Sequence, residues 1–143
     1  GEKLGDILRE SRWDQIIGTW VDAGTQGAAV KTTYAWKIKD MVLEVTSKEG
    51  QNESVALMGV NGKTGEVFHM GGDSQGTTFL GKWVFEGNGD AVLELVFTSG
   101  DGQKGALSVR QHLEGNDTLI VTVELLQPIT VKMIRAKPAH TTD

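Results

Sequence analysis

The segment Thr78-Phe79-Leu80-Gly81-Lys82-Trp83-Val84-Phe85-Glu86-Gly87-Asn88-Gly89-Asp90 alternates apolar and polar side chains and then ends in glycines. Phe79 and Trp83 fall on one face, whereas Lys82 falls on the other, which is the pattern of a half-buried strand. The closing Gly-Asn-Gly-Asp contains the residue types that tolerate positive φ, as tight hairpin turns require. The segment therefore predicts a strand that leads into a hairpin.

The same unit recurs along the whole chain. Further turn clusters of Gly, Asn, Asp and Ser lie at 61–65, 99–102 and 114–117, and runs rich in Val, Thr, Leu, Phe and Trp separate them. A spacing of about 8–12 residues per strand and turn is typical of an all-β sandwich or barrel. We expect ten strands, at 16–23, 29–39, 41–48, 53–61, 66–73, 77–86, 90–98, 103–112, 117–126 and 128–136.

The short connections favour a closed barrel over a two-sheet sandwich. Strands joined by short turns pair with their chain neighbours in antiparallel fashion. Ten strands in one open sheet would expose two long edges, and closure removes both. A sandwich with Greek-key crossovers is the alternative, but such crossovers usually need longer connections. We therefore expect an all-β, antiparallel, up-and-down barrel of about ten strands.

A short helix is expected before the first strand, over 5–13. Asp6 is a candidate N-cap, because its side chain can accept hydrogen bonds from free backbone amides. Ile7, Leu8 and Trp13 can form an apolar stripe that plugs one end of the barrel. The tail from 137 to 143 is polar, and we expect it to be frayed.

Composition narrows the class of protein. The 143 residues suit one domain, which we place at 1–143 with its core at about 13–137. No cysteine is present, so a disulfide framework and thiolate chemistry are excluded. The 14 basic and 19 acidic residues are scattered, give a net charge of −5 and form no basic run, so we expect no nucleic-acid partner. Apolar runs are far shorter than the roughly 20 residues of a transmembrane helix.

Gly18-Thr19-Trp20, directly after the expected helix, resembles the Gly-x-Trp motif of the calycin superfamily. This superfamily includes lipocalins, fatty-acid-binding proteins and heme-binding nitrobindins. The resemblance, closest to bacterial lipocalin-like proteins of unassigned function, implies that Trp20 lies near the closed end. It also implies that a basic residue of the last strand packs across it, and Arg135 is the candidate. Residues 21–27 do not reproduce the glycine-rich extension of nitrobindins, so no cofactor is expected.

Aromatic and methionine side chains dominate the expected interior. Their number suggests a ligand-binding wall, since methionine adapts to irregular ligands and a ten-stranded barrel is wide. A core filled by side chains alone is the other outcome. The candidate ligand-binding residues are Tyr34, Trp36, Met58, His69, Met70, Phe79, Trp83 and Phe97. We expect a small, largely apolar ligand, with Tyr34 or His69 supplying a hydrogen bond.

His69 can face the interior, or it can face outward if Phe68 and Met70 take the inner positions. An enzyme acting in the barrel would need a polar cluster around His69, and no Gly-x-Ser-x-Gly motif accompanies it. His69, His112 and His140 have no metal-ligand spacing, so no metal site is expected. An interaction module that uses the outer surface is a third possibility. The oligomeric state and compartment stay open, although a removed export signal would fit a chain that starts at Gly1.

Overall fold

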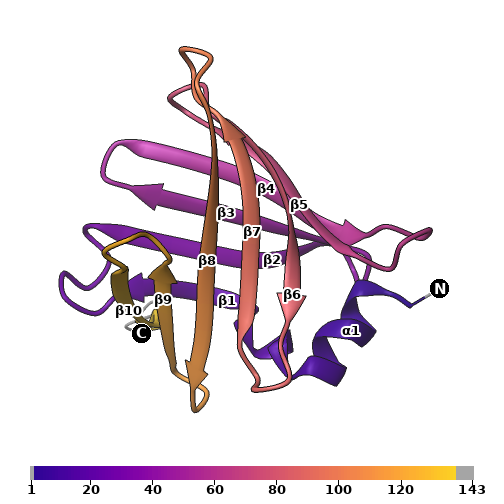
Figure 1. Ribbon diagram of the computed structural model, residues 1–143. Coiled ribbons are helices and arrows are strands. Elements are labelled where there is room, and N and C mark those ends of the chain that lie inside the picture. The colour runs from indigo at the N-terminus through magenta and orange to yellow at the C-terminus, as the bar shows by residue number, and fades with distance from the viewer. Residues whose placement is uncertain (1, 138–143) are drawn as a thin grey trace.

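Ten antiparallel strands form a closed barrel in the computed structural model, which describes residues 2–137 (Figure 1). The strands are β1 (Gly18–Asp22), β2 (Val30–Ile38), β3 (Val42–Glu49), β4 (Asn52–Val60), β5 (Val67–Asp73), β6 (Thr78–Phe85), β7 (Ala91–Thr98), β8 (Lys104–Glu114), β9 (Thr118–Val123) and β10 (Ile129–Arg135). Each strand pairs with its chain neighbour, and β10 pairs with β1. The predicted up-and-down barrel is confirmed, and the sandwich alternative is wrong. The polar tail from 138 onward, with His140, lies outside the described residues.

The predicted strands match the observed ones to within a few residues. The largest difference is the end of β9, which stops at Val123 rather than at 126. Pro128 has no amide hydrogen to continue the ladder, so the chain turns and leaves Leu126 fully exposed. At the end of β2 a register shift between Trp36 and Ile38 leaves Ile38 58% exposed, whereas simple alternation predicts an inward position.

The N-terminal segment forms helix α1 (Leu4–Ser11) and then a short 3-10 helix (Trp13–Ile16). Leu8 and Trp13 of the predicted stripe are buried in the barrel core, and Ile7 is half-buried against it, so this segment plugs one end as expected. Leu4, which was not predicted, is buried there as well. The predicted capping role of Asp6 is wrong. Lys3 holds the cap position without a side-chain hydrogen bond, and Asp6 lies inside the first turn, where it pairs with Arg9 at 2.7 Å.

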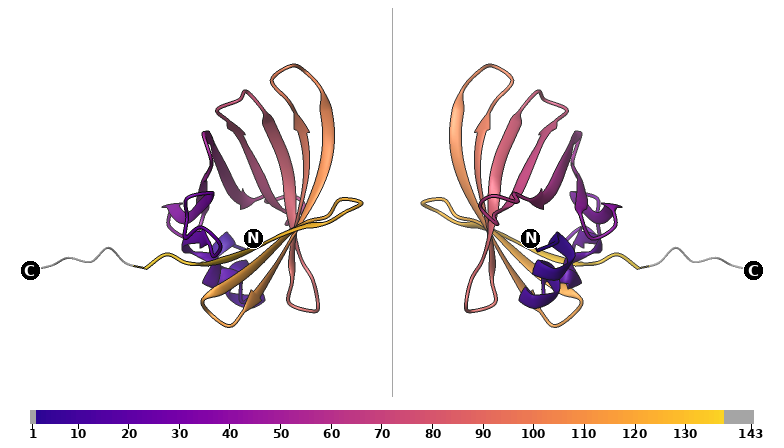
Figure 2. Two further views of the ribbon diagram at one scale, coloured as in Figure 1. Left: turned by 90° about the vertical axis from the view of Figure 1, so that its left-hand side faces the viewer. Right: turned by 90° about the vertical axis from the view of Figure 1, so that its right-hand side faces the viewer.

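Helix α1 is attached to the turns at one end of the barrel, which we call the closed end. The Gly5 amide donates to the Asp40 carbonyl at 3.0 Å, and the Trp13 indole donates to the Gly89 carbonyl at 3.0 Å. A side chain at Gly5 would meet the carboxylate of Asp40, which would have to move to make room for it. Figure 2 shows α1 below the barrel and the β3–β4, β5–β6 and β7–β8 hairpin tips on the other side, at the open end.

Neither helical segment within 2–137 has the length and apolar character that crossing a bilayer demands.

The first and last strands are joined by Trp20 and Arg135, which are direct partners in the β1–β10 ladder. The Arg135 guanidinium carbon lies 4.3 Å from the ring centroid of the fully buried Trp20. The same guanidinium donates hydrogen bonds to three backbone carbonyls, those of Asn116 (2.7 Å), Ile17 (3.2 Å) and Gln15. One side chain therefore ties the last strand, the 3-10 helix and the β8–β9 turn together.

Replacing Arg135 tests this closure. Arg135→Ala should lower the free energy of unfolding by about 2–4 kcal/mol, because it removes the cation–π contact and leaves three carbonyls without their charged donor. Arg135→Lys should recover less than half of the loss, since an ammonium group lacks the planar guanidinium geometry that lets several N–H groups donate at once. Urea unfolding measures both, with Lys132→Ala on the exposed face of the same strand as the control. Equal stability of Arg135→Ala and the control would contradict the assignment.

Candidate functional site

Most of the predicted interior residues lie on the inner face of the barrel. Seven of them are buried or half-buried there: Tyr34, Trp36, Met58, His69, Phe79, Trp83 and Phe97. The inward placement of Met70 is wrong, because its side chain is 44% exposed on the outer face. Successive strand residues alternate between faces, so His69 and Met70 cannot both point inward.

His69 is the ionisable group buried deepest in the wall of β5, with 6% of its surface exposed. The Trp83 indole donates a hydrogen bond to its Nδ1 at 3.2 Å. An indole N–H can only donate, so Nδ1 is the acceptor and the ring proton sits on Nε2. Burial lowers the pKa of His69 to about 4, so the ring is neutral near pH 7. Within residues 2–137 no group accepts a hydrogen bond from Nε2.

Gln111 on β8 is a second polar group on the inner face, and the sequence analysis missed it. It is 4% exposed, and its Oε1 is buried without a hydrogen-bond partner among the described residues. Burial raises the pKa of Tyr34 to about 12, and the neighbouring Gln111 amide opposes part of that rise. The alternation of Val109, Gln111 and Leu113 along the strand is the signal that could have identified Gln111 as an inward residue.

The closed half of the barrel is filled by side chains. The void found there measures only about 10 Å³, room for about one water molecule. Its lining residues come from α1, the 3-10 helix and three strands of the wall: Leu8, Trp13, Ile16, Tyr34, Met58, Trp83 and Phe85. Two of these lining residues contact the buried polar groups. Tyr34 neighbours Gln111, and the Trp83 indole donates a hydrogen bond to His69.

The inner face towards the open end is only half-buried, and it mixes apolar side chains with the polar Thr32, Ser47 and Ser54. Its half-buried apolar residues that pack on the core are Val30, Phe79, Leu95, Val109, Val121 and Val131. Phe97 is the ladder partner of Phe79 on the same face. The exposed surface of these residues contrasts with the closed half, where Trp20, Leu43 and Met58 are almost fully covered. The core is therefore covered less completely towards the open end than at the closed end.

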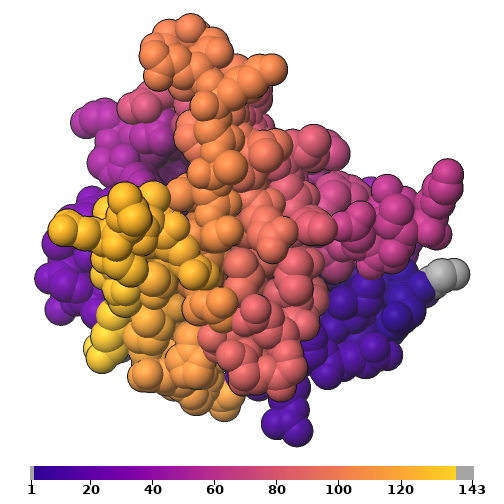
Figure 3. Space-filling model, in the orientation of Figure 1, coloured from indigo at the N-terminus to yellow at the C-terminus, as the bar shows by residue number. Residues whose placement is uncertain are grey.

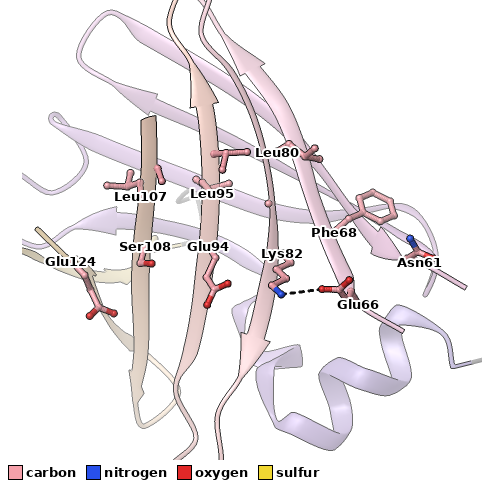
Figure 4. Close-up of a pocket in the computed structure, with 13 residues that line it drawn as sticks. Asn61, Glu66, Phe68, Leu80, Lys82, Glu94, Leu95, Leu107, Ser108 and Glu124 are labelled. Carbon is pink, nitrogen blue, oxygen red and sulfur yellow. Dashed lines mark ion pairs between the residues drawn. The ribbon is translucent and has the colours of Figure 1, made fainter. Parts of the chain in front are cut away.

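A separate hollow of about 790 Å³ lies on the outer face of β5 to β8 (Figure 4). Figure 3 shows this face toward the viewer. Polar side chains border it on one side, and Lys82 pairs with Glu66 there at 3.2 Å. On the other side the ladder aligns four exposed apolar residues across β4 to β7, which we call the outer apolar row: Leu57, Met70, Leu80 and Val96.

The titration of His69 should make stability depend on pH. The pKa is about 6.5 in the unfolded chain and about 4 in the folded one, so the unfolded state binds more protons between these values. Stability is therefore fully present above pH 6.5 and declines as the pH falls toward 4. Urea unfolding should give a loss of about 2 kcal/mol between pH 7 and pH 5.

His69→Asn should abolish most of that loss, because the amide oxygen can accept from Trp83 but does not titrate. His112→Asn is the matched control, since His112 is exposed and pairs with Asp90 at 2.7 Å. An unchanged pH dependence in His69→Asn would show that His69 is not the responsible group.

Comparison of the chain with protein-family models, with characterised proteins and with solved structures finds no match. The architecture of ten antiparallel strands with a short N-terminal helix is compatible with a calycin-like fold.

Proposed function

We propose that the protein binds a small, largely apolar molecule inside the barrel, entering between the hairpin tips. The observation that carries this proposal is His69, a neutral side chain set among apolar walls with one nitrogen held by Trp83 and the other free. A donor in such a setting orients a ligand without adding charge. Phe79 and Trp83 flank the imidazole, each with its ring centroid 5.9 Å away.

Apolar burial would supply most of the affinity. The half-buried wall residues at the open end lose their remaining exposed surface when a ligand covers them, at about 25 cal/mol per Å². The hydrogen bond from His69 Nε2 would contribute mainly orientation, because the ligand exchanges a bond to water for it. This division resembles that of pockets in which a few polar groups direct an apolar ligand.

The environment of His69 favours binding over catalysis. A catalytic histidine is usually oriented by a carboxylate that accepts from its ring N–H. The recorded partner of His69 is instead the indole of Trp83, which donates to the ring. A ring whose pKa is about 4 is also a weak base near pH 7. We therefore assign no reaction to this site.

A second candidate function is self-association through the outer apolar row. On the outer face of β6 and β7 the ladder pairs Leu80 with Val96 and Lys82 with Glu94. Consider a two-fold axis that lies just outside this face, parallel to the two strands and midway between them. It would place Leu80 over Val96 of a second copy. It would also place Lys82 over Glu94 of that copy. The face is therefore complementary to itself in both apolarity and charge, as a two-fold interface requires.

Binding inside the barrel is tested by placing a larger side chain on its inner wall. Val121→Trp should weaken binding of the uncharged fluorophore N-phenyl-1-naphthylamine roughly tenfold or more, because the indole occupies inner space beside Gln111. Ile120→Trp places the same ring on the opposite face of the same strand and should bind normally. Fluorescence titration measures both. Equal affinities, or no binding by the wild-type chain, would refute the proposal.

Self-association is tested by sedimentation velocity over a wide range of protein concentration. The wild-type sedimentation coefficient should rise with concentration, and Leu80→Glu should hold it at the monomer value, because a carboxylate then replaces the centre of the apolar contact. Thr130→Glu adds the same charge on exposed β10 and should behave as the wild type. A monomeric wild-type chain at the highest concentration would eliminate this candidate.

A further inference from the structure

We infer that β8 binds an extended peptide segment of a partner protein as an added antiparallel strand at the open end of the barrel. The segment pairs with residues 104–107, which we call the free edge because β9 does not reach them. It carries apolar side chains at its central positions and an acidic residue beside Lys104. The free edge lies at the rim of the barrel, so its occupation is independent of a small ligand in the interior.

The free edge exists because β8 has 11 residues and β9 has only six. β9 pairs with β8 from Val109 to Glu114, and the last bond between the two segments runs from the Glu124 amide to the Ser108 carbonyl at 2.9 Å. Figure 2 shows that the β9–β10 turn then points away from the β7–β8 hairpin. Within the part of the chain that the structure describes, no strand therefore pairs with residues 104–107 on the side opposite β7.

The backbone of the free edge directs hydrogen-bonding groups away from β7. The Gln103 carbonyl accepts from the Ser99 amide across the hairpin at 2.7 Å, so the backbone of Gln103 faces β7. Backbone direction alternates along an antiparallel strand, so Gly105 also faces β7, whereas Lys104 and Ala106 face outward. Both of these outward residues are exposed. A row of unpaired amides and carbonyls is a template for another strand.

The inner face of the free edge favours apolar side chains on an added strand. Leu107 is half-buried there, and the Phe97 ring fills the space that a side chain at Gly105 would need. Residues of an added strand opposite these two positions lie on apolar surface and gain from its burial. The β9–β10 turn, at the end of the free edge, carries three more exposed apolar side chains, those of Leu125, Leu126 and Ile129.

The outer face favours one more apolar residue and then an acidic one. Ala106 is the ladder partner of Val96 and so extends the outer apolar row, which an apolar residue opposite Ala106 continues. Lys104 is exposed and forms no ion pair with any residue in 2–137. An acidic residue opposite Lys104 forms a cross-strand pair of opposite charges.

A second copy of β8 fits the free edge less well than a separate peptide does. A two-fold antiparallel pair centred on Ala106 would use the whole edge and set Gln103 of the second copy opposite Val109. Val123 of β9 already occupies that position. The β7–β8 hairpin of the second copy would therefore collide with β9, whereas a peptide can begin beside Ser108 and avoid it.

Titration of the nitrogen-15-labelled chain with the blocked peptide acetyl-Thr-Val-Val-Leu-Glu-amide tests this assignment by NMR. The five peptide residues are designed to lie opposite Ser108, Leu107, Ala106, Gly105 and Lys104, in that order. The amide resonances of Lys104 and Ala106 should shift in a saturable way. At saturation their exchange with water should slow at least about fivefold, because peptide carbonyls accept from them.

The matched control peptide carries an N-methyl group on its central valine. It keeps every side chain but loses the donor to the Ala106 carbonyl, so it should bind at least about tenfold more weakly. Equal affinities for the two peptides would show that apolar contact alone attracts them, and would overturn the inference. The absence of a saturable shift at millimolar peptide would overturn it as well.

Ala106→Pro tests the edge from the side of the protein. Proline removes an amide that points away from β7, so the β7–β8 ladder keeps its bonds while the unmethylated peptide should bind roughly tenfold more weakly. Ala106→Ser keeps the amide and should bind as the wild type does. Equal binding by the two variants would contradict strand addition. The comparison of the two peptides needs no variant, and it decides the question if Ala106→Pro does not fold.

Sedimentation velocity separates a partner peptide from a second copy as the occupant. Leu80→Glu should remain monomeric at all concentrations, because the free edge does not pair with itself. Association that persists in Leu80→Glu and disappears in the double variant Leu80→Glu/Ala106→Pro would show that a second copy fills the edge. That outcome would overturn the assignment to a partner protein.

Discussion

The barrel depends on the contact between Arg135 and Trp20, which joins its last strand to its first. An open ten-stranded sheet would have two edges with unpaired amides and carbonyls, and the β1–β10 ladder removes both. Arg135 stabilises this ladder by covering the Trp20 ring and by bonding to carbonyls on two other segments. Gly18 is part of the same arrangement. Its φ of 131° suits glycine, and a side chain there would approach the guanidinium at 3.1 Å.

Closure creates two faces with different properties. The inner face is filled at the closed end, where α1 and the 3-10 helix add Leu8 and Trp13 to the core, and half-exposed at the open end. Three inward charged residues, Asp22, Asp73 and Arg135, are engaged in loop and closure contacts. A neutral, apolar ligand is the occupant that such an interior would tolerate at the lowest desolvation cost. The outer face combines alternating charges with an aligned apolar row.

The sequence predicts the strands well because period-two alternation and glycine-rich turns are local signals. It does not predict which face Met70 occupies, since both faces of β5 carry apolar residues and only the alignment with Leu57 and Leu80 places Met70 outside. The outward turn at Ile38 depends on a register shift that no local pattern reveals. Asp6 was misjudged because the helix begins at Leu4, three residues before the start at Ile7 that a cap at Asp6 requires. The free Oε1 of Gln111 depends on which side chains surround it, and those come from distant strands.

The most direct test of binding inside the barrel is the nitrogen-15 NMR spectrum of the His69 ring near neutral pH, with and without N-phenyl-1-naphthylamine. We expect a neutral ring with its proton on Nε2, and a clear shift of Nε2 and its proton when the fluorophore binds. A proton on Nδ1, a cationic ring, or resonances that do not move at saturating fluorophore would contradict it.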